Sequence, residues 1–266
     1  MPGEIRLHAE DRYSRMRLVT GVDINAIRDS HICVVGAGAL GNEVIKDLAL
    51  YAPARLSIVD RDYVEYSNLG RCFLFNEQDA EERNGKAEAA SRSAHSINTD
   101  CKAEAVNEDV TALDASFFSQ YDAVFGCVDS IKTRLHLNSN CYFSGIPYID
   151  GGIDGLYGRV QVVFPPHSPC YECAINATHL SQIDRGYSCT GREANVPNRQ
   201  IASDPSVCGT VGSLQTLQGL RVVSGTLSEG TLLFFDGFSS SLLPLELAVD
   251  PKCINHVSPP ETTSSI

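Results

Sequence analysis

A short apolar run that breaks into closely spaced glycines constrains the fold more than any other stretch of this chain. Residues His31–Gly41 read His-Ile-Cys-Val-Val-Gly-Ala-Gly-Ala-Leu-Gly, so that Gly36, Gly38 and Gly41 precede a helical pattern. This spacing is typical of the strand, turn and helix start of a nucleotide-binding βαβ unit. The glycines let the backbone approach a polyphosphate, and the helix N-terminus offers N–H groups to its charge. The pattern fits NAD, FAD and ATP equally.

The rest of the chain repeats the alternation of apolar runs and helical patterns. Strands are expected at 55–60, 103–107, 123–128 and 147–152, with helices at 42–51, 86–97 and 130–143. Alternating residues at 159–164 predict an antiparallel addition to the sheet, and an apolar helix at 209–223 is followed by predicted strands at 231–236 and 243–249. The expected fold is therefore α/β, with a Rossmann-like, mostly parallel sheet extended by antiparallel strands.

Composition limits the classes of partner and compartment. The 266 residues show no strong compositional shift, which favours one domain over 1–257, with a mobile crossover loop at 174–207 and a disordered tail at 258–266. The net charge of −12 argues against a nucleic-acid partner. No apolar run approaches the ~20 residues of a membrane span, and the N-terminus carries no apolar signal region, so a cytoplasmic protein is expected.

Two paired sets of metal-ligand residues indicate a zinc site. Cys170-Tyr-Glu-Cys173 is followed much later by Cys253-Ile-Asn-His256, which together offer four ligands of the type that tetrahedral structural zinc requires. A Cys-x-x-Cys pair alone would also fit a redox pair, and a histidine near a chain end is often simply exposed. The second pair favours zinc, which would tie the end of the chain to the body of the fold.

Polar residues at the predicted ligand edge of the sheet distinguish the nucleotides. Asp60 closes the strand after the glycines, where a carboxylate meets ribose hydroxyls, and Asp129 follows a later strand. Asp129 could equally cap the helix that follows it. Asn68, Arg71 and Lys86 add an amide and two cations, which a nicotinamide enzyme does not need. Cations that stabilise transferring phosphoryl groups, and a carboxylate that holds Mg²⁺, favour ATP.

These residues resemble the ThiF-type adenylyltransferases, the activating enzymes of ubiquitin-like proteins and of the sulfur carriers in molybdopterin and thiamine synthesis. The resemblance covers about residues 12–256. The matching pieces are Arg12-Tyr-Ser-Arg15, Gly36-Ala-Gly-Ala-Leu-Gly41, Asp60-x-Asp-x-Val-x-x-Ser-Asn68-Leu-x-Arg71, Gly85-Lys86, Asp129-Ser130, Pro169-Cys-Tyr-x-Cys173, Gly212-Ser-Leu-Gln215 and the pair that begins at Cys253. The Ser-Asn-Leu-x-Arg block is the most specific of them.

The resemblance implies a role for each matching residue. Asp60 would bind the ribose, three residues would grip the phosphates (Asn68, Arg71 and Lys86), and Asp129 would hold Mg²⁺. Arg15 would reach across a homodimer into the ATP site of the partner subunit. That role replaces the simpler interpretation of 11–19 as a helix with a solvated basic face.

The reaction implied is attack by the C-terminal glycine carboxylate of a small β-grasp protein on the α-phosphate of ATP, which gives an acyl-adenylate and pyrophosphate. The sequence departs from the family pattern at Cys72, where glutamine is usual, and at His256, which replaces a cysteine. The expected cofactors are ATP, Mg²⁺ and Zn²⁺. The expected partners are a ubiquitin-like or sulfur-carrier protein and a second copy of the chain, together with a conjugating enzyme if a thioester forms.

A thioester step would need a reactive cysteine in the long loop. Cys189, in Tyr-Ser-Cys-Thr, resembles the arrangement in ubiquitin-type activators, and Arg185 and Arg192 nearby would lower a thiol pKa. An ordinary exposed loop cysteine is the alternative, and Cys208 is a second candidate that is expected to pack at a helix start instead.

Four further functions stay open. Within the family, activation of a sulfur carrier would end at the adenylate or at an acyl persulfide, without a thioester on the enzyme. The substrate could instead be a peptide or a tRNA-linked carboxylate, although the acidic charge disfavours tRNA. An NAD-dependent oxidoreductase and a catalytically inactive dimeric scaffold are the alternatives from other classes.

Overall fold

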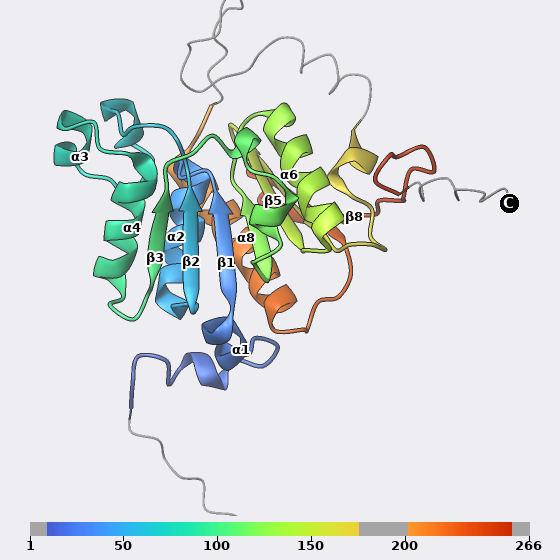
Figure 1. Ribbon diagram of the computed structural model, residues 1–266, viewed down its shortest axis with the longest axis horizontal. Coiled ribbons are helices and arrows are strands. Elements are labelled where there is room, and N and C mark those ends of the chain that lie inside the picture. The colour runs from blue at the N-terminus through green and yellow to red at the C-terminus, as the bar shows by residue number, and fades with distance from the viewer. Residues whose placement is uncertain (1–9, 176–201, 257–266) are drawn as a thin grey trace, which may run out of the picture.

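The computed structural model describes residues 10–175 and 202–256. Its strands form one sheet in the order β3-β2-β1-β4-β5-β6-β7-β8 (Figure 1). The parallel part comprises β1 (His31–Val35), β2 (Arg55–Val59), β3 (Ala103–Val106), β4 (Ala123–Gly126) and β5 (Tyr148–Asp154). The antiparallel extension comprises β6 (Tyr157–Val163), β7 (Thr231–Asp236) and β8 (Ser241–Leu245). The expected fold class, including the antiparallel extension, is confirmed.

Helices cover both faces of the sheet. One layer consists of α2 (Ala39–Tyr51), α4 (Lys86–Ile97) and α8 (Pro205–Val223), and the other of α5 (Ala115–Phe118) and α6 (Ile131–Ser144). Strand β1 shows why, because Ile32 and Val34 belong to the apolar cluster of the first layer, whereas Cys33 and Val35 belong to that of the second. Successive side chains of a strand point to opposite faces, so a continuous apolar run is buried on both.

Shorter elements surround the sheet. A 3₁₀ turn, η1 (Met16–Leu18), and α1 (Ile24–Asp29) lie before β1, whereas η2 (Tyr66–Asn68) and α3 (Glu77–Glu81) lie between β2 and α4. The remaining 3₁₀ turns are η3 (Val110–Ala112) and η4 (Tyr171–Ala174). No helix of the described residues is long and apolar enough to cross a membrane.

Some element boundaries differ from the sequence expectations. The predicted helix at 11–19 is wrong, because only the η1 turn forms there and none of its residues is buried. A short helix without an apolar face to bury has little to stabilise it. Helix α8 begins four residues earlier than expected, since Asp204 accepts hydrogen bonds from the backbone N–H groups of Ser206 and Val207 and Pro205 occupies the first turn.

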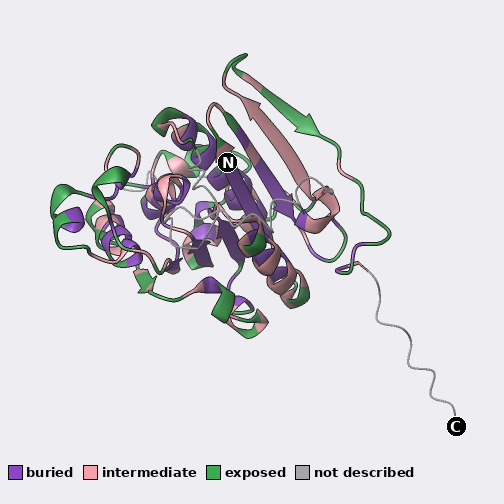
Figure 2. Ribbon diagram, turned by 90° about the horizontal axis from the view of Figure 1, so that it is seen from above, coloured by how far each residue is buried: buried purple, intermediate pink, exposed green. Residues whose placement is uncertain are grey.

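The last strand is also shorter than predicted. β8 ends at Leu245 because its partner strand β7 begins at Thr231. The last pair of the ladder joins Leu232 and Leu245. β8 is the edge of the sheet, where Pro244 is tolerated. Figure 2 shows this edge exposed, with the partly buried β7 between it and the buried centre of the sheet, and Leu243 and Leu245 are about half exposed.

Candidate functional site

The glycine loop lies where β1 ends, at the carboxyl edge of the parallel strands. Gly36 has a φ of +93°, and a Cβ added there would lie 2.6 Å from the carbonyl oxygen of Cys127. Both its conformation and its close neighbour therefore require glycine. A Cβ added at Gly38 would meet nothing within 4 Å. The backbone at Gly38 thus borders open space, as an approaching polyphosphate needs.

The third glycine is required by packing alone. Gly41 lies inside α2, and a Cβ there would come within 1.9 Å of the carbonyl oxygen of Gly36. The first turn of α2 is thereby pressed against the loop. The Gly-x-Gly-x-x-Gly spacing serves three different needs at three positions, as expected for a dinucleotide-type loop.

We expect Gly41→Ala to lower the free energy of unfolding by about 1–3 kcal/mol, as overpacked sites do, measured by urea denaturation. Helix propensity alone would raise it by about 1 kcal/mol. Gly209→Ala in α8 is the matched control, because its Cβ would meet only Glu43 at 3.9 Å. The control should be neutral or stabilising. Equal stabilisation by both alanines would show that the contact with Gly36 relaxes without strain.

Asn42, in the first turn of α2, supports this loop and has no motif in the sequence that marks it. Its side chain is fully buried, and its Nδ2 donates to the carbonyl oxygens of Ala37 at 2.7 Å and Gly38 at 3.1 Å. Its Oδ1 accepts from the backbone N–H of Leu74 at 2.7 Å. Asn42 therefore ties the glycine loop to the segment that carries Arg71. An asparagine in a predicted helix has no pattern that would reveal this contact.

Asp60 closes β2 beside the glycine loop. Its carboxylate accepts from the backbone N–H groups of Ala37 at 2.7 Å and Asp62 at 2.8 Å. Burial raises the pKa of Asp60, and the positive charge of Lys86 and these two hydrogen bonds oppose that rise. The predicted ribose ligand thus adjoins the loop, as the sequence spacing indicated.

Lys86 is the first residue of α4 and is 8% exposed. Its Nζ lies 3.1 Å from a carboxylate oxygen of Asp62, and its backbone N–H donates to the Asp62 carbonyl at 2.8 Å. Lys86, the predicted phosphate-binding cation, therefore lies close to Asp60 and Asp62, the two acids that follow β2. Asp62, a member of the Asp60-x-Asp motif, is thus an ion-pair partner of Lys86.

Arg71 and Asn68 follow on the adjoining turn. Asn68, in η2, accepts from the backbone N–H of Glu65 at 2.9 Å, and Arg71 donates to the carbonyl of Ser67. Next to them Cys72 is buried, which raises its pKa to about 11 against the opposing positive charges of Arg71 and Lys86. The thiol at the position where the family usually carries glutamine therefore lies within the electrostatic reach of both predicted phosphate cations.

The segment after β4 packs directly on the glycine loop. The backbone N–H of Cys127 donates to the carbonyl of Val35 at 2.8 Å, and Asp129 follows, partly exposed. The alternative role of Asp129 as a helix cap is wrong, because Ser130 is the residue whose side chain accepts from the backbone of Thr133 at the start of α6. The Asp129 carboxylate has no hydrogen-bond partner among residues 10–175 and 202–256, so it remains available to a ligand.

Arg15 does not join the site of its own chain. It is exposed, just before η1, and that segment adjoins the amino ends of the strands, below the sheet in Figure 1. Tyr13 anchors the segment there, since its hydroxyl donates to Asp100 at 2.8 Å and accepts from Asn98 at 3.0 Å. The glycine loop lies at the opposite edge, so within one chain Arg15 cannot reach it.

The candidate loop cysteine lies outside the described residues. Cys189 falls in 176–201, as does most of the predicted crossover loop, and the predicted tail at 258–266 lies outside as well. Cys208 is buried in the first turn of α8, with its Sγ 3.4 Å from the hydroxyl of Ser203, as the sequence analysis expected.

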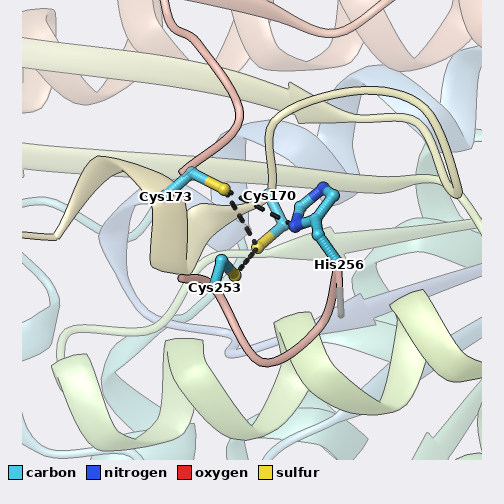
Figure 3. Close-up of side chains that lie close together, drawn as sticks. All are labelled: Cys170, Cys173, Cys253 and His256. Carbon is cyan, nitrogen blue, oxygen red and sulfur yellow. Dashed lines mark hydrogen bonds between the residues drawn. The ribbon is translucent and has the colours of Figure 1, made fainter. Parts of the chain in front are cut away.

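The four predicted metal ligands come together (Figure 3). The ligand atoms of Cys170, Cys173, Cys253 and His256 all lie within 4.8 Å of one another. The Cys170 Sγ lies 3.9 Å from that of Cys173 and 3.5 Å from that of Cys253, and the Cys173 Sγ lies 3.6 Å from Nδ1 of His256. Ligands about 2.3 Å from a tetrahedral zinc would be separated by about 3.8 Å, so the cluster has the dimensions of such a site.

Polar groups around the cluster fit a bound metal. Nε2 of His256 lies 3.0 Å from the carbonyl oxygen of Ser168, which would accept its proton and leave Nδ1 to face the metal. The ring of Tyr142 packs against that of His256 at 4.9 Å. Nδ2 of Asn255 lies 3.5 Å from the Cys170 Sγ. His256 is therefore held as a ligand would be, and not exposed, so the cluster could hold a metal ion.

Comparison with known proteins agrees with this arrangement. The model of the ThiF family matches residues 11–255. The sulfur carrier protein ThiS adenylyltransferase of Bacillus subtilis is 34% identical over 229 residues, which are 85% of this chain and 64% of that protein. The chain thus spans just under two thirds of that relative. The SAMP-activating enzyme E1 of Haloferax volcanii is 29% identical over 249 residues, 91% of this chain and 87% of that protein.

A solved structure shows the same fold. The crystal structure of Escherichia coli MccB with ATP superposes with a TM-score of 0.76 at 19% identity, over 95% of this chain and 75% of that one. The family model spans the glycine loop, the acids after β2, the segment after β4 and the cysteine cluster. On this match over nearly its whole length, the chain belongs to the ThiF family.

Proposed function

We propose that this protein activates the C-terminal carboxylate of a small ubiquitin-like or sulfur-carrier protein by ATP-dependent adenylation. One observation carries the proposal: the glycine loop, Asp60, Lys86 and the segment that ends at Asp129 adjoin one another at the carboxyl edge of the parallel strands. Ligands bind at this edge in open α/β sheets. The names of the relatives support this class of substrate.

The residues present fit ATP better than a nicotinamide dinucleotide. Asp60 would bind the ribose, and the open backbone at Gly38 would receive the phosphates. Lys86 and Arg71 supply positive charge, and Asn68 supplies an amide, where the phosphates would lie. The Asp129 carboxylate, which has no hydrogen-bond partner in the described part of the chain, would hold Mg²⁺, which when bound would neutralise charge on the phosphates.

The chemistry requires positioning rather than a base. A carboxylate oxygen of the carrier would attack the α-phosphorus, forming a P–O bond while the bond to the β-phosphate oxygen breaks and pyrophosphate leaves with its electron pair. An ionised carboxylate has no proton to lose, so the enzyme contributes alignment and charge stabilisation. Lys86 and Arg71 would stabilise the negative charge that develops on the departing phosphates.

The placement of Arg15 supports a shared site. Because Arg15 is exposed at the edge opposite its own glycine loop, we assign it to the ATP site of the partner subunit in a homodimer. An arginine supplied from a second chain stabilises transition-state charge in other phosphoryl-transfer enzymes. The described part of the chain then forms one ThiF-type adenylation domain with a structural zinc at Cys170, Cys173, Cys253 and His256.

Carrier-dependent exchange of labelled pyrophosphate into ATP tests the function. Exchange that needs ATP, a divalent cation and a carrier ending in a free carboxylate is the expected result. Nicotinamide binding without exchange would identify an oxidoreductase, and an absence of both with an intact dimer would identify a scaffold. A carrier whose last glycine is amidated is the matched control, because it can bind but offers no nucleophile.

We propose further that the acyl group passes to Cys189. Its thiolate would attack the acyl carbon, forming a thioester and releasing AMP, and the conjugate with the carrier should be cleaved by reductant. Cys189→Ala is expected to abolish the conjugate, as shown by gel electrophoresis without reductant, while exchange persists. Cys208→Ala is the control and should keep it. A conjugate that survives Cys189→Ala would show that another cysteine acts.

The alternative is a sulfur carrier that is activated without a thioester on the enzyme. Exchange at full rate with no reductant-sensitive conjugate in the wild type would favour that function. The similarity to the ThiS adenylyltransferase is the observation that supports it.

A further inference from the structure

An ion cluster around a fully buried carboxylate lies beside the candidate nucleotide site. Asp150, in β5, is 0% exposed, and both its oxygens accept hydrogen bonds from Nη1 of Arg134 at 2.6 Å. Nη2 of Arg159 donates to it at 2.6 Å, and the Tyr148 hydroxyl at 2.8 Å. None of these four residues has a role in the chemistry described so far.

Arg134 connects this cluster to the segment that carries Asp129. It lies in the first turn of α6, and its Nη2 donates to the carbonyl of Val128, the residue immediately before Asp129. Its Nη1 also donates to the Gly151 carbonyl at 2.7 Å. A single guanidinium thus joins the segment after β4 to the middle of β5, and its planar group of donors suits such bridging.

The segment held in this way is packed against the glycine loop. The Cys127 backbone N–H is bonded to Val35, and a side chain at Gly36 would collide with the Cys127 carbonyl. There is consequently little room on the loop side, and the Val128 carbonyl is held from the other side by Arg134. The backbone before Asp129 is therefore held between two fixed groups.

Stability alone does not explain a buried ion cluster here. Burial opposes the charge on Arg134, and Asp150 overcomes this and raises the pKa, so the guanidinium stays protonated. Ion pairs of this kind are often no more stabilising than apolar residues of similar volume. A cluster that binds a specific carbonyl next to a ligand residue has a geometric use that apolar residues cannot replace.

We propose that Arg134, anchored by Asp150, is a positioning residue that orients Asp129 toward the metal ion of the bound nucleotide. This inference rests on the proposed function, because it takes Asp129 as the Mg²⁺ ligand. Arg134 touches neither the nucleotide nor the carrier in this assignment. Its effect is therefore expected on the Mg²⁺ dependence of ATP binding and not on the binding of free ATP.

Arg134→Lys tests the inference, because lysine keeps the charge but has one nitrogen for partners on two sides. Calorimetric titration of the full chain with ATP, at a series of Mg²⁺ concentrations, should show that the half-saturating Mg²⁺ rises about tenfold, the effect of about 1.4 kcal/mol. ATP binding without Mg²⁺ should change less than about twofold. Arg159→Lys is the control, since Arg159 binds Asp150 whereas the hydrogen bond to the Val128 carbonyl comes from Arg134, and its Mg²⁺ dependence should stay that of the wild type.

Two further variants keep the test decisive. Adding Arg134→Lys to Asp129→Asn should change the Mg²⁺ dependence no further, because the ligand is already lost. If Arg134→Lys does not fold, the double variant Arg134→Met with Asp150→Asn removes both charges and should show the same rise in half-saturating Mg²⁺.

Equal weakening of ATP binding with and without Mg²⁺, or an unchanged Mg²⁺ dependence, would overturn the inference. Carrier-dependent exchange in the wild type separates this failure from that of the proposed function, which would abolish exchange itself.

Discussion

Replacing Cys170 with serine is expected to remove zinc from the protein and to destabilise the whole domain. Cys170 is completely buried, and its Sγ is next to those of Cys173 and Cys253. A structural zinc binds with about 10–16 kcal/mol in small zinc-finger peptides, which matches the whole stability of about 5–15 kcal/mol of a typical domain. Loss of even half of such a contribution should leave little folded protein at 37 °C.

Metal analysis by inductively coupled plasma spectrometry and urea denaturation measure the two parts of this result. Wild type should carry one zinc per chain, and a chelator should lower its thermal midpoint. Cys101→Ser is the matched control, because Cys101 is also a buried free thiol but lies outside the cluster. The control should retain its zinc. Wild-type protein purified without zinc, or a Cys170→Ser variant that keeps it, would contradict the zinc assignment.

Replacing Lys86 with methionine is expected to reduce carrier-dependent pyrophosphate exchange about 10²–10³-fold, the effect typical of removing one preorganised charge-stabilising group. Methionine keeps much of the buried stem and removes only the cation. Lys46→Met is the control, since Lys46 is likewise a paired lysine, bound to Glu43 within α2. An exchange rate that falls equally in the two variants would show that Lys86 acts only through folding.

The same variant should also change how stability depends on pH. Burial raises the pKa of Asp60, and the charge of Lys86 partly offsets this, so the pKa should rise further without Lys86. A carboxyl whose folded pKa is raised stabilises the fold below its unfolded pKa, and that contribution is lost as pH rises through the folded pKa. Lys86→Met should therefore lose more stability at about pH 7 than at about pH 4, measured by urea denaturation. An equal loss at both values would show that Lys86 and Asp60 are not coupled.

Several parts of the fold and site follow from local sequence. Lys86–Ile97 and Thr231–Asp236 form a helix and a strand with the predicted bounds, because their apolar periodicity and propensities agree with their environment. The Cys/His cluster also followed from sequence, since a spacing of two intervening residues places each pair on one tight turn. Local rules were insufficient for 11–19. This segment is held in place by the hydrogen bonds of the Tyr13 hydroxyl to Asp100 and Asn98, which are distant in sequence, and not by a helix.

Sequence by itself determined the glycine loop, the acid that follows β2 and the four residues of the Cys/His cluster, because each depends on residues near one another in the chain or on a motif with fixed spacing. Only the tertiary structure decided that Ser130 and not Asp129 caps α6, that Arg15 lies at the opposite edge from its own glycine loop, and that Arg134 binds the Val128 carbonyl. These features depend on where separate strands end relative to one another. That placement follows from the register and order of the whole sheet, which no short stretch of sequence encodes.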